Sequence, residues 1–216
     1  MMKVVEIFKS IDGEGKRAGL PTTFIRLYGC NLRCSYCDSQ YAWSGNNYEE
    51  MSVDKILTAV KELGITSITL TGGEPLIHKD VKELLSKLVE CKFDVNVETN
   101  GTQDIDIYRS ISDDIWFTVD YKCNSSLVSD KMNEDIFKHQ LKDKDVLKFV
   151  VGSDEDLKQA LDVIKAYKPN AQIYFSPVFG FDASKIVDFL LAEKLYNCKV
   201  QLQLHKYIWD EDKRGV

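Results

Sequence analysis

The chain has 216 residues, of which 44% are hydrophobic and 29% are charged, and its formal net charge is −6. These values are typical of a globular protein and exclude a disordered or fibrous one, while the mild acidity argues against a general nucleic-acid coat. No apolar run reaches the ~18 residues that a membrane helix needs, and the first residues lack a signal-peptide pattern. We therefore expect a cytoplasmic protein with no membrane or nucleic-acid partner.

Apolar, β-branched runs alternate with helical patterns from the first third of the chain to its end. Ser52 and Ser153 are typical N-caps, and Gly64 is placed to end the helix that follows Ser52. Another helix carries Val81 and Leu84 on one face, and a further helix carries Ile186. The expected strands are residues 24–28, 67–71, 93–97, 115–119, 146–151, 173–175 and 200–204.

Strands that alternate with helices predict a parallel sheet. We count about six such units after a short N-terminal extension, whereas a complete barrel has eight and typically ~250 residues. The sequence therefore predicts an α/β protein with a partial (β/α)6-type barrel, built as a single domain over residues 1–216. No repeat, low-complexity tract or linker interrupts it.

The chemistry of such folds lies at the carboxyl ends of the strands. Four segments directly follow an expected strand: the cysteine-rich segment 30–37, Gly72-Gly73-Glu74-Pro75, residues 98–101 and residues 120–122. We expect all four to converge on one face of the sheet.

Three of the six cysteines, Cys30, Cys34 and Cys37, form a CxxxCxxC motif. Nothing in the sequence indicates secretion, so metal binding or redox chemistry is favoured over disulfides. Three thiolates on one loop can hold three irons of a four-iron cluster and leave the fourth iron open. Zinc is the competing metal, but it would need a fourth ligand, and the three histidines are scattered.

The CxxxCxxC motif followed by Gly72-Gly73-Glu74-Pro75 resembles the radical S-adenosylmethionine (SAM) superfamily, whose fold is a partial or full barrel. Residues 10–15, 19–27 and 29–39 and the tail Gln203-Leu204-His205-Lys206 resemble the 7-carboxy-7-deazaguanine synthase family within it. The resemblance implies a lyase that converts 6-carboxy-5,6,7,8-tetrahydropterin to 7-carboxy-7-deazaguanine, with loss of ammonia, in queuosine and 7-deazapurine biosynthesis.

The resemblance also implies cofactors and their ligands. Cys30, Cys34 and Cys37 would hold a 4Fe-4S cluster whose open iron chelates SAM, and Ser39 would bind Mg²⁺. The expected SAM contacts flank the cysteines or follow strands, and they are Tyr36, Asp38, Gly73, Glu74, Asn100 and Lys122. Asn100-Gly101 is also a common turn pair, so the sequence leaves both interpretations of Asn100 open.

The implied pterin site combines a loop, a strand residue and the tail. Arg26 interrupts an apolar strand and offers a planar fork for the substrate carboxylate. The remaining expected contacts are Ile11, Asp12, Gly13, Glu14 and Thr71. His205 is the candidate catalytic residue, although a lone histidine is more often structural.

The resemblance further implies a homodimer that receives electrons from a protein such as flavodoxin or ferredoxin. Two other hypotheses remain at this point. One is a glycyl-radical-enzyme activating enzyme, which shares the chemistry but acts on a protein backbone. The other is a non-catalytic iron–sulfur or zinc-binding module, which would not cleave SAM.

Overall fold

The structure is a computed structural model that describes residues 1–210 and 213–216, and one nine-stranded sheet organises this part of the chain. Neighbouring strands follow the order β3-β1-β2-β4-β5-β6-β7-β8-β9. The strands are β1 (Met2–Ile11), β2 (Pro21–Leu27), β3 (Glu49–Met51), β4 (Ser67–Gly72), β5 (Asp94–Thr99), β6 (Trp116–Lys122), β7 (Val146–Val151), β8 (Gln172–Pro177) and β9 (Lys199–Val200).

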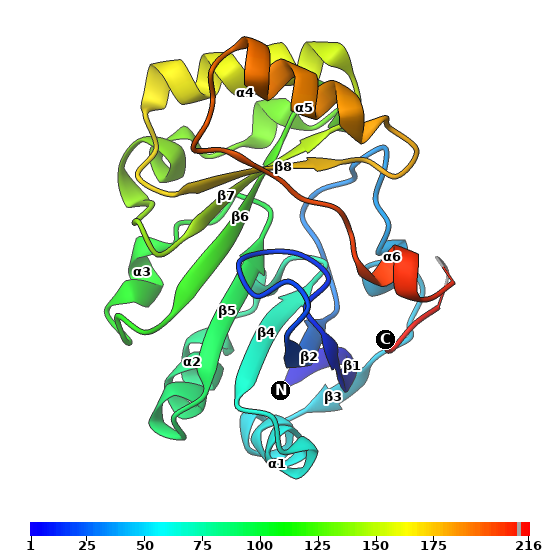
Figure 1. The fold of residues 1–216 in the computed structure, drawn as a ribbon. Coiled ribbons are helices and arrows are strands. Elements are labelled where there is room, and N and C mark those ends of the chain that lie inside the picture. The colour runs from blue at the N-terminus through cyan, green and yellow to red at the C-terminus, as the bar shows by residue number, and fades with distance from the viewer. Residues whose placement is uncertain (211–212) are drawn as a thin grey trace.

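Every neighbouring pair from β2 to β9 is parallel, whereas β1 runs antiparallel to β2 and β3. Within the described residues the sheet starts at β3 and ends at β9 without closing on itself, and it is strongly curved (Figure 1). β2, β4, β5, β6, β7 and β8 supply the six parallel strands of the expected barrel. The prediction of a partial (β/α)6-type barrel is therefore confirmed.

Two parts of the sheet differ from the expectation. The N-terminal extension is a ten-residue strand, β1, and residues 49–51 add the edge strand β3. Of the last expected strand, residues 200–204, only Val200 pairs with β8, together with Lys199 just before it. The chain leaves the sheet there because the Gln201 side chain and the Leu204 N–H bind the segment around Gly15 and Gly13 instead.

The helices form where the sequence combines a cap with an apolar stripe. The Ser52 Oγ accepts a hydrogen bond from the Lys55 N–H at 3.2 Å, and Gly64 ends that helix at a φ of 75°. The Ser153 Oγ accepts from the Asp156 N–H in the same way. The helices are α1 (Val53–Leu63), α2 (Val81–Glu90), α3 (Asp106–Arg109), α4 (Asp154–Tyr167), α5 (Ala183–Ala192) and α6 (His205–Ile208).

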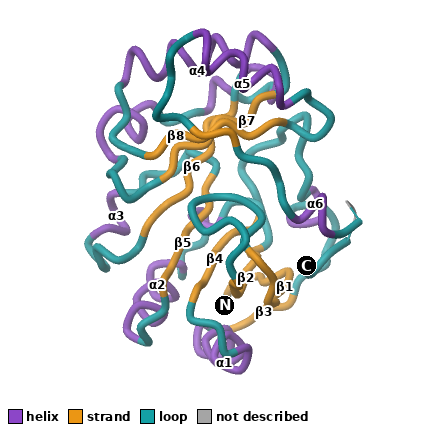
Figure 2. The backbone as a smooth tube through the Cα atoms, viewed as in Figure 1, coloured by secondary structure: helices purple, strands orange, loops and turns teal. Residues whose placement is uncertain are grey.

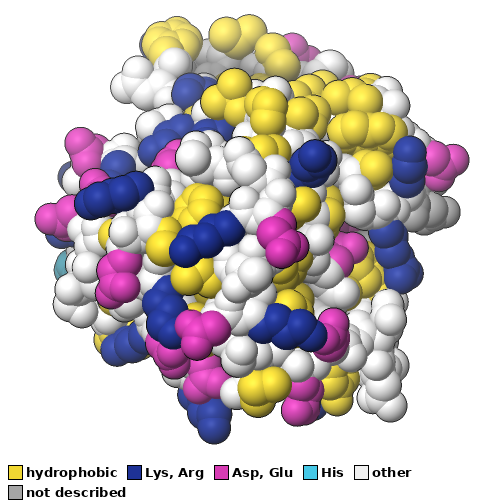
Figure 3. Space-filling view, turned by 90° about the horizontal axis from the view of Figure 1, so that it is seen from below, with side chains coloured by type: hydrophobic (Ala, Val, Ile, Leu, Met, Phe, Trp, Pro, Cys, Tyr) yellow, Lys and Arg dark blue, Asp and Glu magenta, His cyan; other side chains and the backbone are white. Residues whose placement is uncertain are grey.

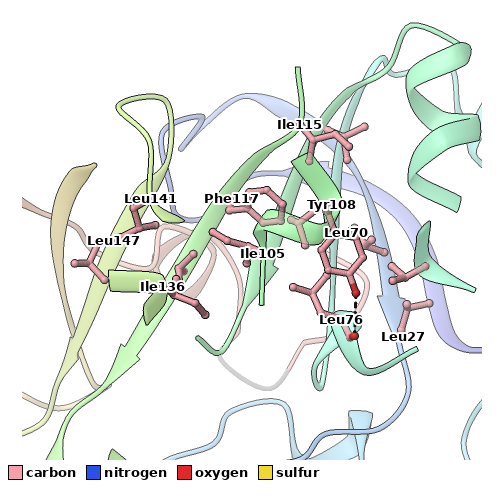
Figure 4. Packing of buried hydrophobic residues seen from close by; sticks show 14 of the residues in the cluster. Leu27, Leu70, Leu76, Ile105, Tyr108, Ile115, Phe117, Ile136, Leu141 and Leu147 are labelled. Atoms are coloured by element: carbon pink, nitrogen blue, oxygen red, sulfur yellow. Dashed lines mark hydrogen bonds between the residues drawn. The ribbon is translucent and has the colours of Figure 1, made fainter. Parts of the chain in front are cut away.

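The longer helices cover the outer face of the curved sheet, and α6 lies at its open side (Figures 1 and 2). Between β5 and β7 the cover is made by short elements, namely α3 and a π-helix at Ile136–Gln140. Their apolar side chains pack on the sheet near Phe117 and Leu147 (Figure 4). The buried Tyr108 hydroxyl donates a hydrogen bond to the Leu76 carbonyl at 3.2 Å.

The segment between β1 and β2, residues 12–20, crosses the barrel at the end where the parallel strands begin, and we call it the floor loop. Gly15 exchanges two hydrogen bonds with the Gln201 side chain, at 2.8 and 2.9 Å. On the opposite side, Arg17 donates to the carbonyls of Ile68 and Asp94, near the starts of β4 and β5. Figure 1 draws this loop in dark blue in front of β4. The floor loop thus joins the two halves of the open barrel.

Lysine and arginine side chains are interspersed with aspartate and glutamate on the face drawn in Figure 3, so neither charge dominates that face. None of the helices in the described part of the chain has the length and apolar character required to span a membrane.

Candidate active site

A cavity of about 820 Å³ lies inside the barrel, between the carboxyl ends of the strands and the floor loop. It collects residues from distant parts of the sequence, as the strand-end rule predicts. All of the expected site residues line it except Asp12 and Glu74. The lining includes Ile11, Gly13, Glu14, Arg26, Cys30, Cys34, Tyr36, Cys37, Asp38, Ser39, Thr71, Gly73, Asn100, Lys122 and His205.

The cysteine loop follows β2 and is held by its neighbours. The Gly29 N–H donates to the Ala42 carbonyl at 2.7 Å, and the Ser35 N–H donates to the Ser126 carbonyl at 3.0 Å. All three cysteines of this loop are free thiols. Burial raises the pKa of the Cys30 thiol, and it does the same for Cys34. A bound metal centre would oppose this effect, because a coordinated thiol is deprotonated.

The donor set fits a cluster better than a single ion. Among the residues that the structure describes, no three His, Cys, Asp or Glu side chains are placed to hold one metal ion. A four-iron cluster has no such requirement, because each thiolate binds a different iron. The Tyr36 hydroxyl, between two of the cysteines in sequence, is buried without a hydrogen-bond partner in the described protein. A ligand that occupied the cavity could supply that partner.

The two glycines after β4 are required by the packing of the chain itself. A Cβ on Gly72 would lie 2.2 Å from the Leu27 carbonyl oxygen, and one on Gly73 would lie 2.2 Å from the Gly29 carbonyl oxygen. Gly72 also has a φ of 152°, which disfavours other residues. The backbone at Gly72 and Gly73 therefore packs closely against the end of β2 and the start of the cysteine loop. This packing brings Gly73 and Cys30 to the same wall of the cavity.

Glu74 lies behind the wall of the cavity and is fully buried. Its carboxylate accepts hydrogen bonds from the Thr99 hydroxyl at 2.9 Å, the Asn100 N–H at 2.7 Å and the Leu76 N–H at 3.0 Å. Burial raises the pKa of Glu74 to about 7. These contacts show that Glu74 holds Asn100 in position. The expected contact of Glu74 with SAM stays a prediction.

Asn100 links the third strand end to the cysteine loop. Its side-chain N–H₂ donates to the Asn31 side-chain oxygen at 2.9 Å and approaches the Cys30 sulfur at 3.8 Å. Its own side-chain oxygen accepts from the N–H and hydroxyl of Thr102. Asn100 therefore makes a local turn bond and also contacts the cysteine loop, and its expected contact with SAM stays a prediction.

Asp12 faces away from the cavity and is 3% exposed. Its carboxylate accepts from Arg17 at 2.9 Å, from the Thr22 hydroxyl at 3.0 Å and from the Thr69 hydroxyl at 2.8 Å. Its backbone N–H and carbonyl are used within the floor loop. Asp12, Arg17, Thr22 and Thr69 form a group that we call the floor cluster. The structure thus gives Asp12 a structural role and no cavity surface.

A second group of charged residues lines the cavity, and we call it the cavity cluster: Glu14, Glu98, Asp120, Lys122 and Lys148. The Lys148 Nζ lies 3.0 Å from a Glu14 oxygen and 3.1 Å from an Asp120 oxygen, and the Lys122 Nζ lies 2.6 Å from the other Asp120 oxygen. Although burial opposes it, the pKa of Lys148 is raised by Asp120 and Glu14. Burial raises the pKa of Glu98 to about 7, while nearby Lys148 lowers it.

Sequence reasoning missed three members of the cavity cluster: Glu98 and Asp120 as site residues, and Lys148 altogether. The signal for Lys148 was present, because a lysine interrupts the apolar strand 146–151 as Arg26 interrupts its own strand. It also missed Glu6, which accepts from the Arg26 Nε at 2.7 Å and from the Tyr41 hydroxyl at 3.1 Å.

The remaining expected residues lie at the rim and at the tail. The Ser39 hydroxyl donates to an Asp38 carboxylate oxygen at 3.2 Å. His205 begins α6 and lies against Gly13, where a Cβ would be 2.1 Å from its Nδ1. Burial lowers the pKa of His205. Gly13 therefore allows the tail to close on the floor loop beside the cavity.

An open barrel whose first parallel strand leads into three cysteines defines the radical SAM class of enzymes. The family model "Radical SAM superfamily" matches residues 24–181. A protein named 7-carboxy-7-deazaguanine synthase from Clostridium acetobutylicum is 43% identical over 99% of both chains. One with the same name from Methanospirillum hungatei is 41% identical over 96% of this chain and 85% of its own. The chain belongs to the 7-carboxy-7-deazaguanine synthase family of the radical SAM superfamily.

Solved structures support the same fold. The crystal structure of QueE from Escherichia coli aligns with a TM-score of 0.71 at 22% identity, over 94% of this chain and 93% of its own. Streptococcus suis SuiB bound to S-adenosylmethionine aligns with a TM-score of 0.59 at 17% identity, over 81% of this chain and 48% of its own. The names of the relatives do not favour the activating-enzyme hypothesis or the non-catalytic module.

Proposed function

We propose that this protein is a radical SAM lyase that converts 6-carboxy-5,6,7,8-tetrahydropterin to 7-carboxy-7-deazaguanine with loss of ammonia, in queuosine and 7-deazapurine biosynthesis. The observation that carries the proposal is the shared cavity, in which the cysteine loop and the charged groups of Glu14 and Arg26 line one space. A pterin carboxylate would meet the Arg26 guanidinium, which the Glu6 carboxylate holds in place.

Cys30, Cys34 and Cys37 would hold the 4Fe-4S cluster. The residues that would surround SAM are Gly73, Asn100, Tyr36, Asp38 and Lys122. When bound, the cluster and SAM would supply the radical chemistry that starts the reaction on the substrate. The chain itself contributes binding and orientation. The Glu74 carboxylate fixes Asn100, and the Glu74 N–H donates to the Gly29 carbonyl at 2.8 Å, which ties the start of the cysteine loop to the end of β4.

The cavity cluster would orient the pterin ring. Glu14 is held from both sides, by Lys148 at 3.0 Å and by the Ser176 hydroxyl at 2.8 Å. A carboxylate fixed in this way can accept hydrogen bonds from the N–H groups of a pterin edge. Ile11, Gly13 and Thr71 complete the wall near it. His205, which lines the cavity beside Gly13, would contact the substrate from the tail.

Several finer assignments belong to the same proposal. Ser39 would bind Mg²⁺ weakly together with the substrate carboxylate, because Mg²⁺ prefers oxygen ligands and keeps several waters. We further propose a cytoplasmic homodimer, with residues 1–216 acting as one domain, that receives electrons from a flavodoxin or ferredoxin.

Two variants test the proposal, one for the cluster and SAM cleavage and the other for pterin binding. The Cys34→Ala variant should lose both SAM cleavage and product after anaerobic reconstitution, because an iron loses its ligand. The Arg26→Ala variant should keep its iron and its slow SAM cleavage without substrate, while its kcat/KM for the pterin falls by about tenfold to a hundredfold. Normal turnover of the pterin by either variant would contradict the site as described.

A further inference from the structure

Trp43 lies six residues beyond the cysteine motif, yet its side chain reaches back to it. The indole Nε1–H donates to the Cys37 sulfur across 3.4 Å. Cys30 receives a comparable bond from the Leu32 N–H at 3.4 Å. The Trp43 contact differs in kind, because it comes from a side chain that can be replaced without altering the backbone of the loop.

Trp43 is held through both its backbone and its ring. The Trp43 N–H donates to the Gln40 carbonyl at 3.1 Å, and its own carbonyl accepts from the Tyr28 hydroxyl at 3.2 Å. The guanidinium of Arg33 lies over the ring, 4.1 Å from its centroid. Arg33 is itself tied to the loop, because its Nη1 donates to the Cys30 and Leu32 carbonyls at 2.8 and 2.6 Å. Trp43 and Arg33 therefore form a fixed pair beside Cys37.

We propose that Trp43 is a positioning residue that sets the reduction potential of the cluster through its hydrogen bond to Cys37. This inference rests on the proposed role of the three cysteines. Reduction adds negative charge to the cluster and its thiolates, and an N–H donor to a thiolate sulfur stabilises that charge. The Arg33 cation, which is stacked on the indole, acts in the same direction. The pair therefore raises the potential and makes the cluster easier to reduce.

The Trp43→Phe variant tests the inference, because it keeps an aromatic ring under Arg33 and removes only the N–H donor. After anaerobic reconstitution, iron per chain is determined, and a redox titration is followed by EPR. We expect unchanged iron content and a midpoint potential shifted to a more negative value. Among the described residues, Trp43 is the tryptophan whose indole donates to a cysteine. The matched control is therefore Trp209→Phe, which should leave the potential unchanged. A Trp43→Phe potential equal to that of the unmodified protein would overturn the inference.

A second measurement uses the unmodified protein, so it does not depend on whether the Trp43→Phe variant folds. The unmodified protein is produced with ¹⁵N-indole tryptophan, its cluster is reduced, and ENDOR spectra are recorded in H₂O and D₂O. We expect an exchangeable proton and an indole ¹⁵N coupled to the cluster, and their absence would overturn the inference. Unmodified protein that assembles no four-iron cluster would instead contradict the proposed function, so the two failures are distinguishable.

Discussion

The floor cluster and the cavity cluster both bury charge within the same barrel, but their partners differ. Arg17 is 6% exposed, and its five hydrogen bonds all end on groups of the fold itself. The cavity cluster pairs its lysines with carboxylates too, but every member also lines the open interior. A buried charge is thus evidence for a ligand site only when part of its surface faces a space that a ligand can enter.

The largest expected effect on stability comes from the floor cluster. The Arg17→Met variant leaves the Asp12 carboxylate buried without its cation, and losing one partner of a buried pair costs about 3–5 kcal/mol. Urea unfolding of the metal-free protein measures this change. The matched control is Lys16→Met, at an exposed neighbouring position, which should cost less than about 1 kcal/mol. If both variants unfolded at the same urea concentration, the structural role of the floor cluster would be wrong.

The cavity cluster should respond in activity more than in stability. The Lys148→Met variant removes the cation that holds Glu14 and Asp120 at the cavity. A displaced Glu14 would orient the pterin poorly, so kcat/KM for the pterin should fall by about 30-fold to 100-fold. Steady-state assays with iron-loaded protein measure this change. The control variant Lys185→Met breaks an exposed pair with Asp154. Equal kcat/KM for the two variants would argue against a site role for the cavity cluster.

The smallest expected effect is a pH dependence at Glu98. Burial raises its pKa to about 7, so between about pH 4.3 and 7 the folded protein keeps a proton that the unfolded chain releases. The free energy of unfolding therefore falls as the pH rises through this window. The Glu98→Gln variant should be more stable than the unmodified protein at pH 8, by about 1–3 kcal/mol, and should lose this advantage near pH 4.5. Urea titrations at both pH values test this, and parallel stability curves would contradict it.

The barrel was predictable because its six parallel strands and their longer helices are strongly patterned. β1 was not, because it runs antiparallel to β2 and the nine residues between them, 12–20, do not form a short hairpin turn. The residues that line the cavity were predictable where a motif names them, as for Cys30 or Arg26. The placement of Asp12 and Glu74 was not predictable, because a motif does not say whether a carboxylate faces the cavity or the residues behind it. That distinction depends on partners such as Arg17 and Thr99, which only the fold brings together.

The most direct test of the account is to look for the product itself. The anaerobically reconstituted protein is supplied with SAM, a reductant, Mg²⁺ and 6-carboxy-5,6,7,8-tetrahydropterin, and the mixture is analysed by mass spectrometry. The account predicts 7-carboxy-7-deazaguanine, formed only when the cluster and SAM are both present. Formation of 5′-deoxyadenosine without 7-carboxy-7-deazaguanine would contradict it, because the radical chemistry would then act on a different substrate.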